Sequence, residues 1–554
     1  MNTTARRHHM MASYVLSVVT LLRLVCLGSN FVLHPPSPSK VDAGKPNPTL
    51  CQASSITSTS FPDDTVFANG SMPCGADSVI LKPKGRHHPW YSLYPLLEGG
   101  LWAAAPGKYF KDKIAECNNE PVFKIHPGLA TIALTDHASG KWFFDQPDTV
   151  LDRQDGAYFG PMRCSQEFLG NSLPALVTNL KEGHPAVREY MLTIVRERLA
   201  SAQTALSHAA EKFYDEKRAN GIGEYNGLYD FFLQQSYQFV LEFLLGTGEE
   251  GGQPLPPFED FRRVNPGDVG PLISLEFDTP VANAVGQAIQ RTTGSGVGKS
   301  EVKASMEVLL ESIRSSKMWP KFVKILDDHK VPTEELERSL MFNTGFQSSV
   351  AIAKSMEYAV GALTANRGFL QELRRELDGK TLTLQSATNV EQFPLLDSFH
   401  WEIVRMFPVP AFFVKDAKMD LLVPTNSGNK YQVKKGDKLI CHQDLVQIDP
   451  AKFGPDAREF KPKRFLENPE LKKDVFKFGF QDSSRPEQQE GMPWGCVAHA
   501  AGVLDGILKF YYGRWVQEMD WEMEKPPVID PDQFLGKVGP TGMSFDKITP
   551  RHHQ

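Results

Sequence analysis

The spacing of apolar residues along the chain predicts a protein built mainly from helices. Apolar positions recur every three or four residues in long stretches, which is the period of a helix that buries one face. These stretches cover residues 185–214, 229–245, 300–325, 333–377, 395–406 and 503–515. Shorter apolar runs of strand length cover residues 121–125, 130–135, 421–423, 431–433 and 438–442. Helices with a few strand pairs in mixed order predict a mostly α fold of the α+β class.

Residues 86–554 are expected to form a single large domain. No internal repeat and no second break in composition interrupts them, although the long helical stretch is expected to break near Asn366. A domain of this length can bury a large core and still enclose a prosthetic group.

The N-terminal segment, residues 1–28, has the pattern of a targeting or anchoring signal. Arg6 and Arg7 precede a largely apolar run over residues 10–28, and no acidic residue occurs before Asp42. A basic region followed by an apolar region predicts a secretory signal or a signal anchor, and thus the endoplasmic reticulum or another membrane. A transit peptide for a plastid or another organelle is the alternative, because the segment is poor in acidic residues and contains Arg and Ser.

Residues 29–85 are rich in proline, serine and threonine. The clearest examples are residues 35–39 and 54–60. Such a stretch buries too little apolar surface to offset the entropy of ordering, so a flexible linker is expected.

Composition excludes some classes of protein. The 554 residues include 60 Lys and Arg against 66 Asp and Glu, which gives a formal net charge of −6, and 41% are hydrophobic. These values exclude a mainly disordered chain and a multi-span membrane protein. They also give no support to nucleic-acid binding through net positive charge. The seven cysteines are scattered without disulfide or zinc spacing, so a functional cysteine is expected to act singly.

Cys496 stands out among these cysteines because it lies just before the predicted helix 503–515. The positive end of a helix dipole favours the thiolate form of a cysteine, and a thiolate can ligate heme iron. Cys496 and His499 lack the second cysteine of a covalent heme attachment motif and a partner pair for zinc. Taken alone, Cys496 fits better as a small hydrophobic residue of the core.

Glu402 and Arg405 place a carboxylate and a guanidinium on one face of the predicted helix 395–406. The same spacing occurs at Glu259, Glu311, Glu335 and Glu372. What singles out Glu402 is the order of the features that follow: a Phe-Pro-Val-Pro stop, strand-like segments and then Arg464, about thirty residues before Cys496. Arg464 is expected to close a buried pair into a triad, because guanidinium binds carboxylate in a fixed fork. Such a triad would support the floor beneath a prosthetic group.

This ordered set, Glu-x-x-Arg on a helix, Pro-x-Arg-Phe and a cysteine loop that enters a helix, resembles the cytochrome P-450 family from about residue 90 onward. Within that family it resembles the branch of allene oxide synthases, hydroperoxide lyases and epoxyalcohol synthases. The stretches that carry this likeness are residues 109–114, 156–161, 401–424 and 431–440. The resemblance implies a heme-thiolate domain with small β-sheets, heme b as cofactor and Cys496 as the axial iron ligand. The ligand loop departs from the family pattern, with Ala498 where glycine is usual.

The resemblance also identifies residues 344–349, Thr-Gly-Phe-Gln-Ser-Ser, as the distal helix. Oxygen-activating members carry an acid followed by threonine there, because splitting O₂ requires delivered protons. Here Gln347 stands at the acid position and Ser348 keeps a hydroxyl. The hydroperoxide branch has Phe-Asn, and Phe346-Gln347 is that pair with one more methylene. The resemblance thus implies that Gln347 binds the peroxide and Phe346 shapes the pocket; an ordinary helix residue is the alternative for Gln347.

His184 and Arg188 open the predicted helix 185–214, where the family has a basic or aromatic residue at a heme propionate. Arg188 is the better candidate because guanidinium pairs bidentately with carboxylate. The alternative is a solvated basic residue at the start of a helix.

Three functions follow from these observations. The first is a heme-thiolate enzyme that rearranges or cleaves a polyunsaturated fatty acid hydroperoxide in oxylipin formation, without O₂ or NADPH. The second is a monooxygenase of a lipophilic substrate, with electrons from a reductase; Ser348 and the N-terminal segment favour it. The third is a heme-binding or lipid-binding protein without turnover.

Overall fold

The computed structural model divides the chain into two units, Met1–Asp77 and Ser78–Gln554, and all described residues lie in the second. It describes residues 80–85, 106–125, 131–147, 149–152, 193, 197–198, 204, 206–208, 210–213, 215–216, 228–245, 255–264, 299–330, 337, 349–409, 412–477, 504–523, 528–529 and 547–551. The expected targeting segment, residues 1–28, and most of the expected linker lie outside this set.

The largest sheet among the described residues has five strands in the order β2-β3-β8-β5-β4. These strands are β2 (Val122–Ile125), β3 (Thr131–Leu134), β8 (Lys438–His442), β5 (Phe412–Ala417) and β4 (Leu151–Asp152). Strands β3 and β8 run parallel, with Ile132 opposite Leu439, and the other pairs are antiparallel. The order brings the segment after α17 (Pro394–Met406) beside strands from the first third of the chain.

A second sheet pairs β1 (Ile80–Leu81) with β7 (Lys430–Val433) in parallel, and β7 with β6 (Leu421–Pro424) in antiparallel. Lys84 also bridges to Phe123. The last residues of the expected linker, 80–85, therefore include Ile80 and Leu81 in this sheet and Lys84 at a bridge. Backbone pairing, which composition does not reveal, orders these residues.

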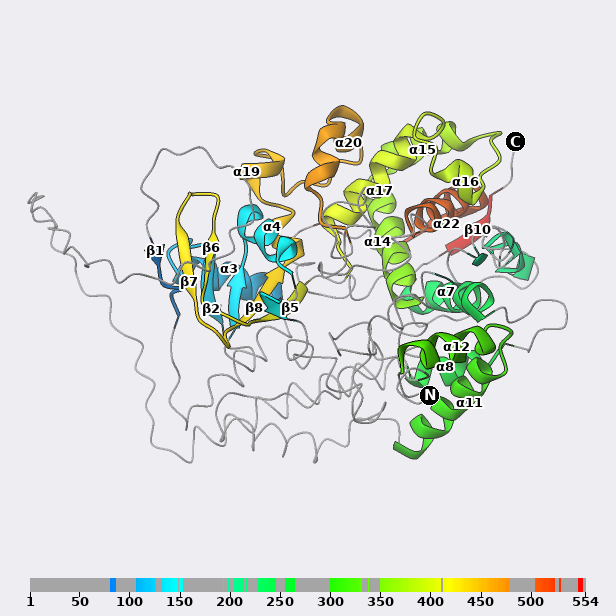
Figure 1. Ribbon diagram of the computed structural model, residues 1–554. Coiled ribbons are helices and arrows are strands. Elements are labelled where there is room, and N and C mark those ends of the chain that lie inside the picture. The colour runs from blue at the N-terminus through cyan, green and yellow to red at the C-terminus, as the bar shows by residue number, and fades with distance from the viewer. Residues whose placement is uncertain are drawn as a thin grey trace, which may run out of the picture. The chain divides into compact units, whose positions relative to one another are not determined.

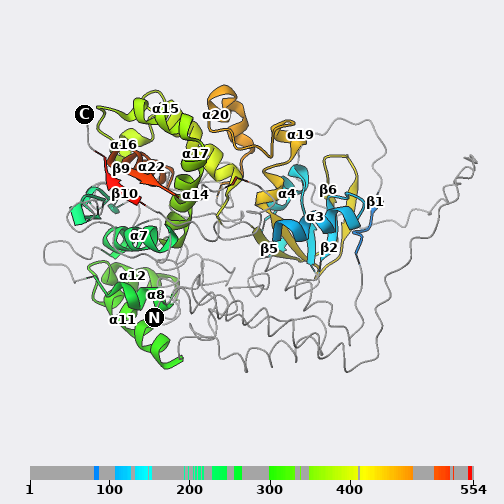
Figure 2. The ribbon, with the colours of Figure 1, turned by 180° about the vertical axis from the view of Figure 1, so that it is seen from behind.

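The helical core is built around α14 (Ala351–Ala365), whose side chains from Ile352 to Thr364 are buried. This helix packs against α7 (Leu228–Leu245), α17 and α22 (Leu504–Glu518), as Figures 1 and 2 show from opposite sides. Phe232 of α7 lies edge-to-face on Trp515 of α22, with 5.0 Å between the ring centroids. The predicted mostly α fold is confirmed.

The structure describes further helices and strands outside this core. They are α3 (Pro106–Glu116), α4 (His137–Asp145), α8 (Phe258–Val264), α11 (Lys299–Arg314), α12 (Trp319–His329), α15 (Arg367–Leu377), α16 (Leu384–Ala387), α18 (Gln443–Val446), α19 (Pro450–Phe453), α20 (Arg464–Glu467), the 3₁₀ helix η4 (Pro469–Asp474), and the strand pair β9 (Met519–Glu522) and β10 (Lys547–Pro550). Among all the described residues, no helix has the length and apolar character that crossing a bilayer requires.

One predicted helix is in fact two. The stretch 300–325 divides into α11, which ends at Arg314, and α12, which begins at Trp319. Pro320 lies in the first turn of α12, where its missing N–H costs nothing, whereas it cannot continue a helix that is already running. The expected break near Asn366 is present between α14 and α15.

All five predicted strands are present, but β5 was not predicted. Its sequence is not an apolar run, because it contains the charged residues Lys415 and Asp416. Both of these side chains are nevertheless buried. The Lys415 Nζ donates to the Phe143 carbonyl at 2.9 Å, and Lys438 pairs with Asp416 at 2.8 Å. Each buried charge therefore has a partner from another element, which the sequence pattern does not supply.

Candidate functional site

Glu402 and Arg405 form a buried ion pair within α17. Both side chains are fully buried. The Arg405 Nε donates to Glu402 Oε2 at 2.8 Å, and its Nη2 donates to Glu402 Oε1 at 2.8 Å. Two parallel bonds of this kind fix the orientation of the guanidinium as well as its position.

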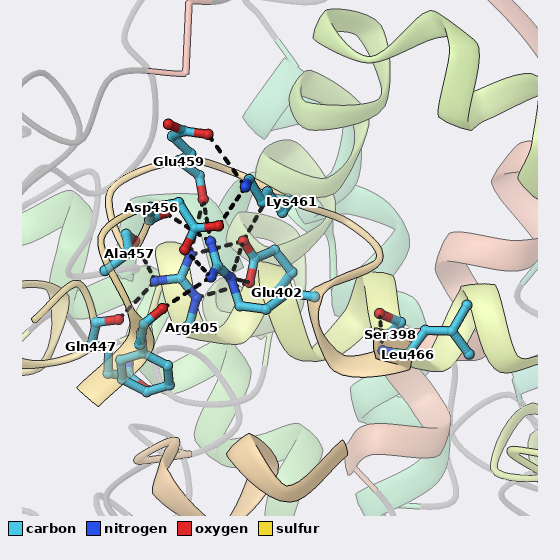
Figure 3. Close-up of polar contacts among 11 residues, drawn as sticks. Ser398, Glu402, Arg405, Gln447, Asp456, Ala457, Glu459, Lys461 and Leu466 are labelled. Atoms are coloured by element: carbon cyan, nitrogen blue, oxygen red, sulfur yellow. Dashed lines mark hydrogen bonds and ion pairs between the residues drawn. The ribbon is translucent and has the colours of Figure 1, made fainter. Parts of the chain in front are cut away.

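Arg464 is the first residue of α20 and lies 59 positions after Arg405 in the chain. Its side chain contacts the Glu402–Arg405 pair. Its Nε lies 3.3 Å from Glu402 Oε2, and its side chain is 4% exposed. Figure 3 shows the Arg405 guanidinium beside the Glu402 carboxylate. The backbone N–H of Lys461 also donates to Glu402 Oε1 at 2.7 Å. The structure thus brings together the three residues that the sequence placed in a triad.

The two arginines also bind backbone carbonyls of the segment that joins β8 to α20. The Arg405 Nη1 donates to the carbonyls of Gln447 at 2.8 Å and Ala457 at 2.6 Å. The Arg464 Nη2 donates to the Glu459 carbonyl at 3.0 Å. Figure 3 shows the Arg405 side chain with Gln447 and Ala457 beside it. The arginines therefore fix the end of α18, at Gln447, and the turns that follow α19, over residues 454–463.

Asp456 is a part of this site that the sequence did not indicate. Its Oδ1 accepts a bond of 2.8 Å from Arg464 Nη1, and Lys461 pairs with its other oxygen. These bonds hold the pKa of the Asp456 carboxyl at about 2. Asp456 gives Arg464 a carboxylate partner in addition to Glu402, which Arg464 shares with Arg405. No periodic pattern marks it, because it lies in a turn.

Comparison with known proteins decides the family. The sequence profile of the cytochrome P-450 family matches residues 324–480, which include the triad. Over 475 residues the chain is 59% identical to an epoxyalcohol synthase of Ectocarpus siliculosus, a match that covers 86% of this chain and 99% of that protein. The chain belongs to the cytochrome P-450 family. The resemblance stated from the sequence is therefore confirmed.

Two further relatives of this P-450 carry names that refer to hydroperoxides. A mitochondrial hydroperoxide bicyclase of Ectocarpus siliculosus is 55% identical, over 86% of this chain and 92% of the relative. A mitochondrial hydroperoxide bicyclase of Plasmodiophora brassicae is 31% identical, over 82% of this chain and 81% of the relative.

The other predicted site residues of this P-450 lie outside the described residues. They are the expected iron ligand Cys496, the expected distal residues Phe346, Gln347 and Ser348, and the expected propionate partners His184 and Arg188. The structure begins again at Ser349, directly after the distal residues. The Ser349 carbonyl accepts a bond of 2.8 Å from Ser236 Oγ, which ties the start of α14 to α7.

Two cysteines of this P-450, Cys117 and Cys441, lie among the described residues. The iron of this family needs an ionised cysteine. Cys117 and Cys441 are buried, and burial raises the pKa of both thiols, so they stay neutral packing groups. The described residues also contain no group of three or more His, Cys, Asp or Glu that could hold a metal ion. Cys496 stays the predicted ligand; it lies eight residues before Leu504, where α22 begins.

Proposed function

We propose that this P-450 rearranges the hydroperoxide of a polyunsaturated fatty acid without consuming O₂ or NADPH. The observation that carries the proposal is its 55% identity, over 92% of the relative, to a protein named as a hydroperoxide bicyclase. The Phe346-Gln347 pair supports the same reaction class, because an amide at the acid position cannot deliver the protons that O₂ cleavage requires.

Heme bound through Cys496 would supply the one-electron chemistry that cleaves the O–O bond, which the substrate already contains. The residues of the chain bind the fatty acid hydroperoxide and set the direction of its rearrangement. The Gln347 amide N–H donates to a peroxide oxygen, Phe346 limits the room beside it, and Ser348 provides a hydroxyl. Arg188, with His184 beside it, balances the charge of a heme propionate.

Glu402, Arg405 and Arg464 act as structural support in this proposal. All three side chains are buried and bonded to one another and to the segment from Gln447 to Lys461, so the proposal gives them no direct contact with the substrate. Their charges are satisfied by one another and by Asp456, so the site costs less than an unpaired buried charge would.

For residues 1–28 we propose import into an organelle rather than anchoring in the endoplasmic reticulum. Two relatives are named as mitochondrial, and the segment has basic residues and no acidic ones. Accumulation of a fusion between this segment and a fluorescent protein in the secretory pathway would contradict the proposal.

The deciding experiment offers linoleate hydroperoxide to the purified heme protein with no NADPH and no reductase. We expect rapid loss of the conjugated diene absorbance together with rearranged products. Turnover only after NADPH and a reductase are added would identify a monooxygenase instead. Inertness under both conditions would identify a heme-binding or lipid-binding protein without turnover.

Replacement of Gln347 tests the distal residue separately. We expect Gln347→Leu to lower kcat for hydroperoxide consumption by roughly 10²-fold, the cost of losing one well-placed donor to a developing charge. Gln347→Asn keeps an amide and should retain most of the activity, which makes it the matched control. Heme content is measured in parallel, and an unchanged kcat in a fully loaded Gln347→Leu protein would show that Gln347 is an ordinary helix residue.

A further inference from the structure

The sheet β1-β7-β6, labelled in Figure 1, has one face in the core and one face toward solvent. Side chains alternate between the two faces of a strand, and residues paired across neighbouring strands share a face. Tyr431 and Val433 of β7 and Val423 of β6 are buried, so they mark the inner face. The outer face holds Ile80, Leu422, Pro424, Lys430 and Gln432. A solvated sheet face is normally polar, so the apolar residues on it are unexpected.

Large apolar side chains are exposed at this outer face. Ile80 is 61% exposed, Leu422 is 36% exposed, and Met419, between β5 and β6, is 44% exposed. Seven large apolar side chains are exposed among the residues that the structure describes, and these are three of them. The other four lie on separate segments: Val308, Val390, Leu466 and Val528. Exposed apolar residues that gather at one place and are surrounded by polar ones indicate a surface that binds a protein or a membrane.

Lysines lie on this face and at one end of it. The strands β1, β6 and β7 contain a single charged residue, Lys430, which pairs with Ile80 on one side and Pro424 on the other. Lys82 follows β1 and Lys435 follows β7, and both are exposed. Because β1 and β7 are parallel, Lys82 and Lys435 lie at the same end of the sheet, where the antiparallel β6 begins.

Acidic residues near this end leave these three lysines in excess. Asp420 pairs with Lys434 at 2.6 Å, and Asp152 pairs with Lys418 at 2.5 Å, so both carboxylates are balanced. The Asp437 carboxylate accepts the backbone N–H of Lys434 at 2.8 Å and keeps its negative charge. Three lysines against this one carboxylate leave an excess of two positive charges among the described residues at this face.

We propose that the outer face of the sheet β1-β7-β6 binds the surface of an anionic lipid bilayer. Ile80, Leu422 and Met419 would enter the headgroup region, and the lysines beside them would attract the anionic headgroups. A second copy of the chain fits this face less well, because its own excess of positive charge would oppose that of the first. Binding of this kind needs no membrane-spanning helix and does not depend on the proposed reaction.

The first test maps the reactivity of individual lysines in the full-length protein. Exposed lysines are acylated with and without vesicles of phosphatidylcholine and phosphatidylserine, and the modified residues are identified by mass spectrometry. We expect these vesicles to slow the acylation of Lys82 and Lys435 several-fold. Lys324 of α12 and Lys473 of η4 are also exposed and should react equally in both samples. Vesicles of phosphatidylcholine alone should give little protection, because they lack the negative charge.

The second test separates the charged and the apolar contributions. Replacing Lys82 and Lys435 by Gln should raise the Kd for the anionic vesicles about fivefold for each lysine, the effect of one basic residue near an anionic surface. Replacing Met419 and Leu422 by Ser should weaken binding even at salt concentrations that screen charges. All these variants should keep the heme content and hydroperoxide turnover of the wild type.

Matched variants on other elements are the controls. Lys324→Gln with Lys473→Gln removes two exposed charges, and Val308→Ser with Leu466→Ser removes two exposed apolar side chains. Both double variants should bind the vesicles as the wild type does. Equal loss of binding in the control variants and in those of the sheet would show that no particular face is used and would overturn the proposal.

Two outcomes of the acylation experiment would also contradict lipid binding at this face. Unchanged reactivity of Lys82 and Lys435 on anionic vesicles would mean that the face stays in solvent, even if residues 1–28 hold the protein on the membrane. Protection that appears without vesicles as the protein concentration rises would identify a second copy of the chain as the partner. Failure of the hydroperoxide assay would leave the lipid-binding result unaffected, because acylation does not measure turnover.

Discussion

Glu402→Gln is expected to prevent recovery of the folded heme protein. The substitution leaves Arg405 and Arg464 buried with no carboxylate between them, although both stay bonded to backbone carbonyls. Removing one partner from a buried ion pair costs about 3–5 kcal/mol. The whole free energy of unfolding of a typical domain is only about 5–15 kcal/mol. The measurements are the yield of soluble protein, its heme content and its thermal unfolding.

Glu372→Gln is the control for this prediction. Glu372 also precedes an arginine by three residues, but its side chain is 36% exposed and it pairs with Lys463 at the surface. An exposed pair contributes about 0–1 kcal/mol, so this variant should fold and load heme normally. If Glu402→Gln behaved like Glu372→Gln, the triad would not be what holds the segment between β8 and α20.

Cys496→Ser is expected to abolish the thiolate spectrum of the reduced, CO-bound protein and most hydroperoxide turnover. A serine hydroxyl stays protonated near neutral pH and is a poor ligand for the iron, whereas a cysteine thiolate donates electron density to it. The spectrum reports the ligand directly, so it identifies the residue even if some heme remains bound.

Cys441→Ser is the control for the ligand assignment. Cys441 is fully buried in β8, and burial raises the pKa of its thiol, so it packs as a small apolar group. This variant should lose stability but keep the thiolate spectrum. Persistence of that spectrum in the Cys496→Ser protein would mean that a different cysteine ligates the iron.

Helix α17 contributes residues to two groups of buried charges. Glu402 and Arg405 on it hold the segment that ends in α20, and Asp397 and His400 on it bind Lys509 and Asp505 of α22. A change in α17 that removes one of these charges is therefore expected to lower the stability of the fold. A substitution in α20 is likewise expected to lower the thermal stability of the fold.

Much of this protein could be predicted from local sequence patterns. Helical periodicity identified α7, α17 and α22, and apolar runs identified five of the strands, because backbone geometry over a few residues controls both. The order of Glu402, Arg405, Arg464 and Cys496 was sufficient to indicate the cytochrome P-450 family.

Only the tertiary structure decided which charged residues are buried together. Glu311 and Arg314 have the same spacing as Glu402 and Arg405, yet Glu311 is 71% exposed whereas Glu402 is fully buried. Likewise, no local pattern pairs Asp456 with Arg464 or Lys477 with Asp505. The physical reason is that a periodic pattern specifies which face of an element is apolar, whereas the partner of a buried charge depends on which distant segments the completed fold brings into contact.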